Sequence, residues 1–164
     1  NRLGELIEEL LYVSKMDNIT KDYVLVERDL REILSDCALK QKAIAVNRGL
    51  EFKFNFDENP VLLVCDEKSV YRAFSNIINN SIRYADKTIT LTCRNEEKNK
   101  FISIENDGEN ISEKDLTNIF ERFYKGNKGK HGIGLSIVKS VINKHDGVVY
   151  AENIENGVRF IVKF

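Results

Sequence analysis

The run Phe74-Ser-Asn-Ile-Ile-Asn-Asn-Ser-Ile-Arg-Tyr84 lies inside residues 66–85, where apolar residues recur at helical spacing. Asp66 is a residue type that commonly caps a helix, so we predict a helix that begins after it and ends near Ala85. At about 100° per residue, one side of this helix is apolar and would face a sheet. That side carries Val70, Ala73, Phe74, Ile77 and Ile78.

The other side of this predicted helix carries two amides and one guanidinium. Asn76, Asn80 and Arg83 fall within roughly 60° of each other. Asn is a mediocre helix former, and a solvated helix face usually carries better ones such as Glu, Lys and Gln. An amide oxygen is a ligand for hard cations, and Arg donates to phosphate. This face is therefore either an ordinary solvated surface or a site for a metal and an anion together.

Four of the nine glycines are concentrated in one short segment, and lysines lie between them. A helix is predicted to begin near Gly132 and to end before Gly147. Glycine lets the backbone approach a ligand closely, and a helix N-terminus suits phosphate. The P-loop string is missing and no strand precedes the segment, so a flexible basic surface loop is the alternative. The glycines are Gly126, Gly129, Gly132 and Gly134, and the lysines are Lys125, Lys128 and Lys130.

A polar turn follows the strand that we predict over residues 101–105. It contains Asn106, Asp107 and Gly108. Polar side chains at the end of a strand can line a pocket, or can simply form a turn. Both interpretations stay open, and in a pocket the Asn or Asp side chain would be placed to read the edge of a purine.

The remaining pattern predicts an alternation of helices and strands in the order α-β-α-β-β-α-β-β-α-α-β-β. Since most neighbouring strands can pair as hairpins, we predict an α+β fold with one mixed, mainly antiparallel sheet and helices on one face, a two-layer sandwich. The further helices are expected at about 1–17, 29–48 and 112–122. The strands are expected at about 23–26, 50–56, 61–65, 88–94, 101–105, 148–152 and 159–164.

The 164 residues have the composition of an ordinary globular domain, with 42% hydrophobic and 31% charged residues. The formal net charge of −1 gives no general attraction to nucleic acid or to an anionic membrane. Cys37, Cys65 and Cys93 have no C-x-x-C spacing, and we predict reduced, buried thiols. His131 and His145 are too few for a zinc site, and no run approaches the ~20 apolar residues of a membrane span.

Five segments, in chain order, resemble the nucleotide-binding boxes of sensor histidine kinases. The wider ATPase superfamily includes gyrase, Hsp90 and MutL. The likeness covers about residues 20–164, and the F box among the five is typical of histidine kinases. The segments are 76–84 (N box), 106–111 (first glycine box), 119–125 (F box), 132–135 (second glycine box) and 156–160 (closing strand motif).

The resemblance implies a Mg²⁺-ATP site made by these boxes. Asn80 would bind Mg²⁺ with Asn76 beside it, and Arg83, where the family usually has Lys, would contact phosphate. Asn106 would hydrogen-bond the adenine amino group. Lys125 would steady the γ-phosphate, so Asn80, Arg83 and Lys125 are the implied catalytic residues. The other implied nucleotide contacts are Tyr84, Gly108, Ile111, Phe120, Phe123, Tyr124, Gly132, Ile133, Gly134 and Leu135.

Three features depart from the family pattern. Asn106 stands where Asp is usual, and Asn110 stands at the second glycine of its box. The lid, about residues 125–131, is short. These departures concern the affinity for the nucleotide more than its class.

The resemblance also implies a domain order and a set of partners. Residues 1–17 are expected to be the end of the second helix of a dimerisation and phosphotransfer bundle, 18–28 a linker, and 29–164 the catalytic ATP-binding domain. The chain is expected to be a fragment that lacks the phosphoacceptor histidine. The implied partners are ATP, the protein's own bundle in a homodimer, and the receiver domain of a response regulator. The implied location is cytoplasmic, with a membrane reached only through upstream segments.

The implied activity is that of a protein histidine kinase. The domain would donate the γ-phosphate of ATP to a histidine on the bundle, for relay to an aspartate of the response regulator. The substitutions at 106 and 110 motivate an alternative, a nucleotide-binding scaffold of the same fold without turnover. A structural or partner-binding α+β domain without nucleotide is the third interpretation.

Overall fold

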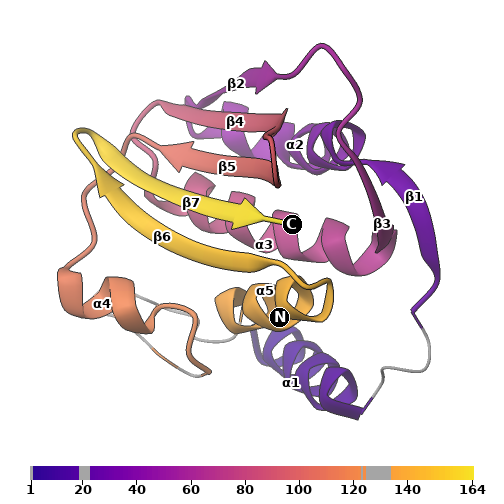
Figure 1. Ribbon diagram of the computed structural model, residues 1–164. Coiled ribbons are helices and arrows are strands. Elements are labelled where there is room, and N and C mark those ends of the chain that lie inside the picture. The colour runs from indigo at the N-terminus through magenta and orange to yellow at the C-terminus, as the bar shows by residue number, and fades with distance from the viewer. Residues whose placement is uncertain (1, 19–22, 123, 125–133) are drawn as a thin grey trace.

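The computed structural model describes residues 2–18, 23–122, 124 and 134–164. Its elements follow the predicted order of helices and strands (Figure 1). The observed bounds lie close to the predicted ones, except that α4 ends well before residue 122. The helices are α1 (Arg2–Asn18), α2 (Leu30–Asn47), α3 (Glu67–Tyr84), α4 (Glu113–Asn118) and α5 (Gly134–Lys144). The strands are β1 (Leu25–Asp29), β2 (Glu51–Phe56), β3 (Leu62–Asp66), β4 (Thr88–Asn95), β5 (Lys100–Asn106), β6 (Val148–Ile154) and β7 (Gly157–Lys163).

The central sheet has five strands in the order β2-β4-β5-β7-β6. β2 runs parallel to β4, and the other neighbouring pairs are antiparallel. The short connections between β4 and β5 and between β6 and β7 form the expected hairpins. The prediction of a mixed, mainly antiparallel sheet is therefore confirmed.

β1 and β3 form a separate two-stranded antiparallel sheet, which the sequence did not predict. We expected a single sheet. Each of these strands leads directly into a helix, β1 into α2 and β3 into α3, and these two helices contact each other. The two strands therefore enter the domain side by side. The Asp29 carboxylate accepts the Val61 N–H at 3.2 Å and joins β1 to the start of β3.

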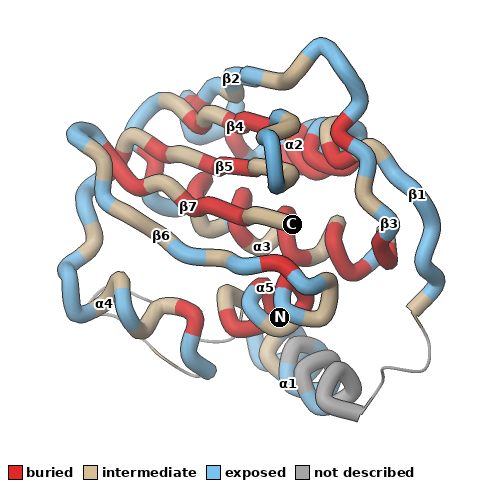
Figure 2. The backbone as a smooth tube through the Cα atoms, viewed as in Figure 1, coloured by how far each residue is buried: buried red, intermediate tan, exposed pale blue. Residues whose placement is uncertain are grey.

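Helices α2, α3 and α5 cover one face of the five-stranded sheet (Figure 1), and the core lies between these layers (Figure 2). Asp66 caps α3 by accepting the Ser69 N–H at 2.9 Å, as the sequence predicted. The apolar side of α3 faces the core as predicted, which turns its polar side away from the sheet. Val70, Ala73, Phe74, Ile77 and Ile78 are all completely buried.

The three cysteines are buried and free, as the sequence predicted. Burial raises the pKa of Cys37 and Cys65 to about 11 and that of Cys93 to about 12. The thiols are therefore protonated at neutral pH and behave as small apolar core residues. None of the described helices is both long and apolar enough to span a membrane.

α1 lies beside α5, and Tyr23 and Val24, which precede β1, contact the rest of the domain. Leu6 of α1 packs against the core. Tyr23 stacks on the His145 ring, with centroids 5.3 Å apart, and the Val24 N–H donates to the Asp66 carboxylate at 3.1 Å. β1 thus overlaps the segment 18–28 that we expect to be a linker, and the domain boundaries stay a prediction.

Candidate functional site

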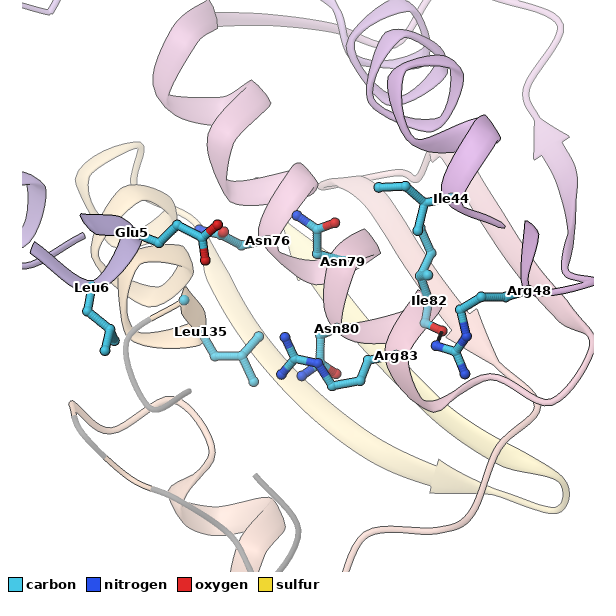
Figure 3. Close-up of a pocket in the computed structure, with 11 residues that line it drawn as sticks. Glu5, Leu6, Ile44, Arg48, Asn76, Asn79, Asn80, Ile82, Arg83 and Leu135 are labelled. Carbon is cyan, nitrogen blue, oxygen red and sulfur yellow. Dashed lines mark hydrogen bonds between the residues drawn. The ribbon is translucent and has the colours of Figure 1, made fainter. Parts of the chain in front are cut away.

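A cavity of about 480 Å³ lies where α1, α2, α3 and α5 meet (Figure 3). Its volume is in the range of pockets that hold small ligands. Among the residues predicted for the site, the cavity brings together Asn76, Asn80, Arg83, Gly134 and Leu135. It is also lined by residues that the sequence analysis did not assign to it, namely Glu5, Leu6, Ile44, Arg48, Asn79 and Ile82.

The polar side of α3 forms one wall of the cavity. Asn76 and Asn80 are partly buried, whereas Asn79 and Arg83 are exposed. The Nδ2 atom of Asn76 is buried and has no hydrogen-bond partner within the described part of the chain. An unsatisfied buried donor costs about 1–3 kcal/mol.

The start of α5 forms a second wall. A methyl group placed on Gly134 would lie 3.8 Å from Cγ and Oδ1 of Asn76, so this helix N-terminus lies beside the amide wall. A helix N-terminus presents unpaired N–H groups and the positive end of the helix dipole. In Figure 3, Arg83 and Leu135 point toward each other from α3 and α5. The two walls together suit an anionic ligand with an apolar part.

The last turn of α2 and the residue that follows it, Arg48, supply lining residues that the sequence analysis missed. The Arg48 guanidinium donates to the Ile82 carbonyl, which places a second cation at the cavity alongside Arg83. Ile44 lies one turn earlier and adds an apolar surface. The spacing of residues within α2 carries no sign of this role, because it depends on how α2 packs against α3.

The predicted adenine-reading turn does not line this cavity, but it packs against the end of α3. Asn106 is 3% exposed, and its Oδ1 accepts the Gly108 N–H at 3.2 Å. A Cβ atom on Gly108 would lie 1.9 Å from the Tyr84 carbonyl oxygen. Only glycine allows this approach. The turn is thus adjacent to the residue that follows Arg83 in the chain.

The Asp107 carboxylate accepts hydrogen bonds from three backbone N–H groups. Its Oδ1 accepts the N–H groups of Asp86, Lys87 and Thr88 at 2.9, 3.0 and 3.1 Å. Burial works against ionisation of Asp107, but these hydrogen bonds outweigh it and lower its pKa. For Asp107 the turn interpretation is therefore correct.

Asn110, which stands where the family has glycine, has a structural role that the sequence did not reveal. Its Nδ2 donates to the carbonyls of Ile154 and Gly157 at 3.0 and 2.7 Å. The Ile111 N–H donates to Asn153 Oδ1 at 2.8 Å, and Asn153 Nδ2 donates back to the Ile111 carbonyl at 2.7 Å. These bonds fasten the turn after β5 to the end of the β6–β7 hairpin.

The described part of the predicted F box lies next to α4, and its residues do not line the cavity. Phe120 is 8% exposed and packs edge-on against Phe160, with ring centroids 6.4 Å apart. The Tyr124 O–H donates to the Asp115 carboxylate at 2.5 Å. Four further predicted site residues lie outside the described residues, namely Phe123, Lys125, Gly132 and Ile133.

The oxygen donors through which this cavity could bind a metal ion are amide oxygens, not a cluster of carboxylates. Within the described residues, no group of three or more His, Cys, Asp or Glu is placed to hold a metal ion. The side chains of Asn76 and Asn80 provide the oxygen donors that Mg²⁺ accepts, but too few to complete its shell. This donor set fits a Mg²⁺ ion that arrives together with phosphate oxygens.

The α+β sandwich thus carries a cavity whose lining suits an anionic ligand. Residues 65–164 match the family described as histidine kinase-, DNA gyrase B-, and HSP90-like ATPase, and the chain belongs to that family. Sensor histidine kinase CssS of Bacillus subtilis is 31% identical to it, over 97% of this chain and 35% of CssS. Sensor histidine kinase WalK of the same bacterium is 28% identical, over 94% of this chain and 27% of WalK. The chain thus spans about a third of the length of such relatives.

Solved structures agree with this assignment. The catalytic domain of histidine kinase ThkA superposes with a TM-score of 0.80 at 25% identity, covering 86% of this chain and 95% of that one. Full-length ShkA in complex with AMPPNP has the same fold, with a TM-score of 0.88 at 19% identity over 99% of this chain and 35% of ShkA. These likenesses place the chain with the ATP-binding domains of sensor histidine kinases, as the five sequence segments predicted.

Proposed function

We propose that this chain binds Mg²⁺-ATP in the cavity between α3 and α5 and donates the γ-phosphate to a histidine on a helical bundle. From there the phosphoryl group would pass to an aspartate of a response regulator. The observation that carries the proposal is the convergence of Asn76, Asn80, Arg83 and Gly134 on one cavity. Membership of the ATPase family supports ATP as the ligand.

The cavity residues suit the charge of a triphosphate. The amide oxygens of Asn80 and Asn76 would hold Mg²⁺, which neutralises phosphate charge when bound. Arg83 donates to phosphate oxygens, and the N–H groups at the start of α5 bind phosphate. Lys125 is proposed to steady the γ-phosphate. Transfer then depends on positioning and charge neutralisation, since the acceptor histidine supplies the nucleophile.

Asn106 is proposed to read adenine. Its Oδ1 already accepts the Gly108 N–H, but a carbonyl oxygen has a second lone pair for the adenine amino group. A charged acceptor makes a stronger hydrogen bond than a neutral one. We therefore expect Asn106→Asp to lower the dissociation constant for ATP by about threefold to tenfold in calorimetry. An increase would contradict this role.

Calorimetry with Mg²⁺-ATP on the wild type and on Asn80→Ala tests the proposed site. Asn80 is partly buried on α3, and alanine favours the helix, so the variant should fold. We expect its binding heat to fall to the background, and Asn55→Ala on the exposed side of β2 serves as the control. Equal heats for wild type and Asn80→Ala would contradict the site.

A nucleotide-binding scaffold without turnover is the alternative. The neutral, already hydrogen-bonded Asn106 at the adenine position favours it. A bundle that carries the acceptor histidine, supplied in trans with Mg²⁺-ATP, separates the two functions. Phosphohistidine on the bundle supports the kinase, whereas nucleotide binding without phosphohistidine supports the scaffold.

The chain is proposed to work as one part of a larger cytoplasmic assembly. Residues 1–17 would be the end of the second bundle helix, 18–28 a linker and 29–164 the catalytic domain. The exposed apolar residues of α1 support a helical partner, as in a homodimeric bundle. A response regulator is proposed as the second partner, because histidine kinase ThkA has been solved in complex with the response regulator protein TrrA. The exposed α1 residues are Leu3, Ile7, Leu10 and Leu11.

A further inference from the structure

α1 contributes an acidic side chain to the proposed nucleotide cavity. Glu5 and Leu6 line this cavity together with residues of α3 and α5. Leu6 packs against the core and α1 contacts α5, so the helix is held at this position. Figure 3 shows the Glu5 carboxylate directed into the cavity on the side where Asn76 lies.

The Glu5 carboxylate brings a negative charge to a cavity that is also lined by two arginines. Among the described residues that line the cavity, only Glu5 has a carboxylate, and Arg48 and Arg83 carry the positive charges. The ion pairs found among the described residues use other carboxylates, so none of these pairs neutralises Glu5 before a ligand arrives. Those carboxylates belong to Asp29, Glu51, Glu67, Glu96, Glu105, Glu121 and Glu152.

We infer that Glu5 competes with the nucleotide phosphates for this cavity and thereby makes the site select Mg²⁺-ATP over metal-free ATP. The inference rests on the proposed function. A nucleotide brings more negative charge into the same space, and the repulsion by Glu5 grows with the charge that no metal has neutralised.

The size of the effect follows from charge and distance. Glu5 is exposed, so the dielectric constant of water is the appropriate one. At roughly 6 Å in water, one unit charge weakens the binding of a like charge by about threefold. Mg²⁺ cancels two charges of ATP, so the preference attributable to Glu5 is about tenfold at low salt and about fivefold after screening.

The coupling also acts in the other direction. If Glu5 weakens the binding of metal-free ATP, then metal-free ATP weakens the docking of α1 by the same factor. Amide hydrogen exchange in α1 reports this docking without any measurement of catalysis. Metal-free ATP should speed exchange in α1 of the wild type, and should have a smaller effect when residue 5 carries no charge.

The test is a titration of the whole chain with ATP at low ionic strength, once with Mg²⁺ and once with a chelator. The variants are Glu5→Gln and, as a matched control, Glu8→Gln, which removes an exposed carboxylate of α1 that does not line the cavity. At this low ionic strength, we expect Glu5→Gln to tighten the binding of metal-free ATP by about tenfold more than it tightens the binding of Mg²⁺-ATP. Glu8→Gln should change neither value.

Three outcomes would overturn the inference. Equal affinities of wild type and Glu5→Gln under both conditions would show that the carboxylate does not oppose the phosphates. Weaker Mg²⁺-ATP binding by Glu5→Gln would make Glu5 part of the metal shell instead of a competitor. A wild type that binds ATP under neither condition would overturn the proposed function together with the inference, and so is distinguishable from the first two.

Discussion

Asn110 stands at a position where the family has glycine, yet replacing it by glycine should destabilise this protein. Its side chain makes the two hydrogen bonds that join the turn after β5 to the β6–β7 hairpin. Among the described residues, Asp146 is the only non-glycine residue with a positive φ, so the backbone at Asn110 does not need glycine. The substitution would therefore remove contacts without relieving strain.

The structure sets the size of the expected loss. Asn110 is exposed, so water can replace part of what is lost, and two hydrogen bonds contribute about 1–2 kcal/mol together. This is the expected cost of Asn110→Ala. Glycine adds about 0.5–1 kcal/mol of backbone entropy, so Asn110→Gly should cost about 2–3 kcal/mol. For a domain of this size, these losses lower the melting temperature by roughly 3–9 °C.

Urea unfolding followed by circular dichroism measures this loss. The midpoint should fall with an unchanged m-value, and the control Asn55→Ala, an exposed residue of β2, should stay within about 0.5 kcal/mol. The Asn153 side chain fastens the same turn. The free energies of unfolding lost in Asn110→Ala and Asn153→Ala should therefore deviate from additivity in the double variant by more than about 0.5 kcal/mol. An Asn110→Gly variant as stable as the wild type would refute the reasoning.

Three further predictions concern the same region. Gly108→Ala places a Cβ atom 1.9 Å from the Tyr84 carbonyl oxygen and should cost about 2–3 kcal/mol in thermal unfolding; a loss near zero would contradict the packing. Gly134→Ala makes only ordinary contact with Asn76, so the melting temperature should not fall, whereas the methyl group should weaken ATP binding about tenfold by calorimetry. The lowered pKa of Asp107 means that its contribution to stability is complete above about pH 4 and is lost as the pH falls through its folded-state pKa. Asp107→Asn should therefore reduce the slope of stability against pH below pH 4, and an unchanged slope would contradict the assignment.

The order of the elements and the orientation of α3 were predictable because they depend on local periodicity. An apolar stripe such as Phe74 and Ile77 requires burial at helical spacing, whatever the rest of the chain does. The separate β1–β3 sheet and the parallel pairing of β2 with β4 were not predicted. Both depend on which strands the packed helices bring together, and strand sequences carry little information on distant partners.

The sequence by itself determined the polar face of α3, since the spacing of Asn76, Asn80 and Arg83 places them together on any helix. The glycine-rich segment pointed to Gly134 as a candidate phosphate contact, and the resemblance to a family added Leu135. Only the tertiary structure decided that Glu5 from α1 and Arg48 from α2 would meet them. The physical reason is that a face is set by the geometry of one helix, whereas a cavity is set by how four helices pack.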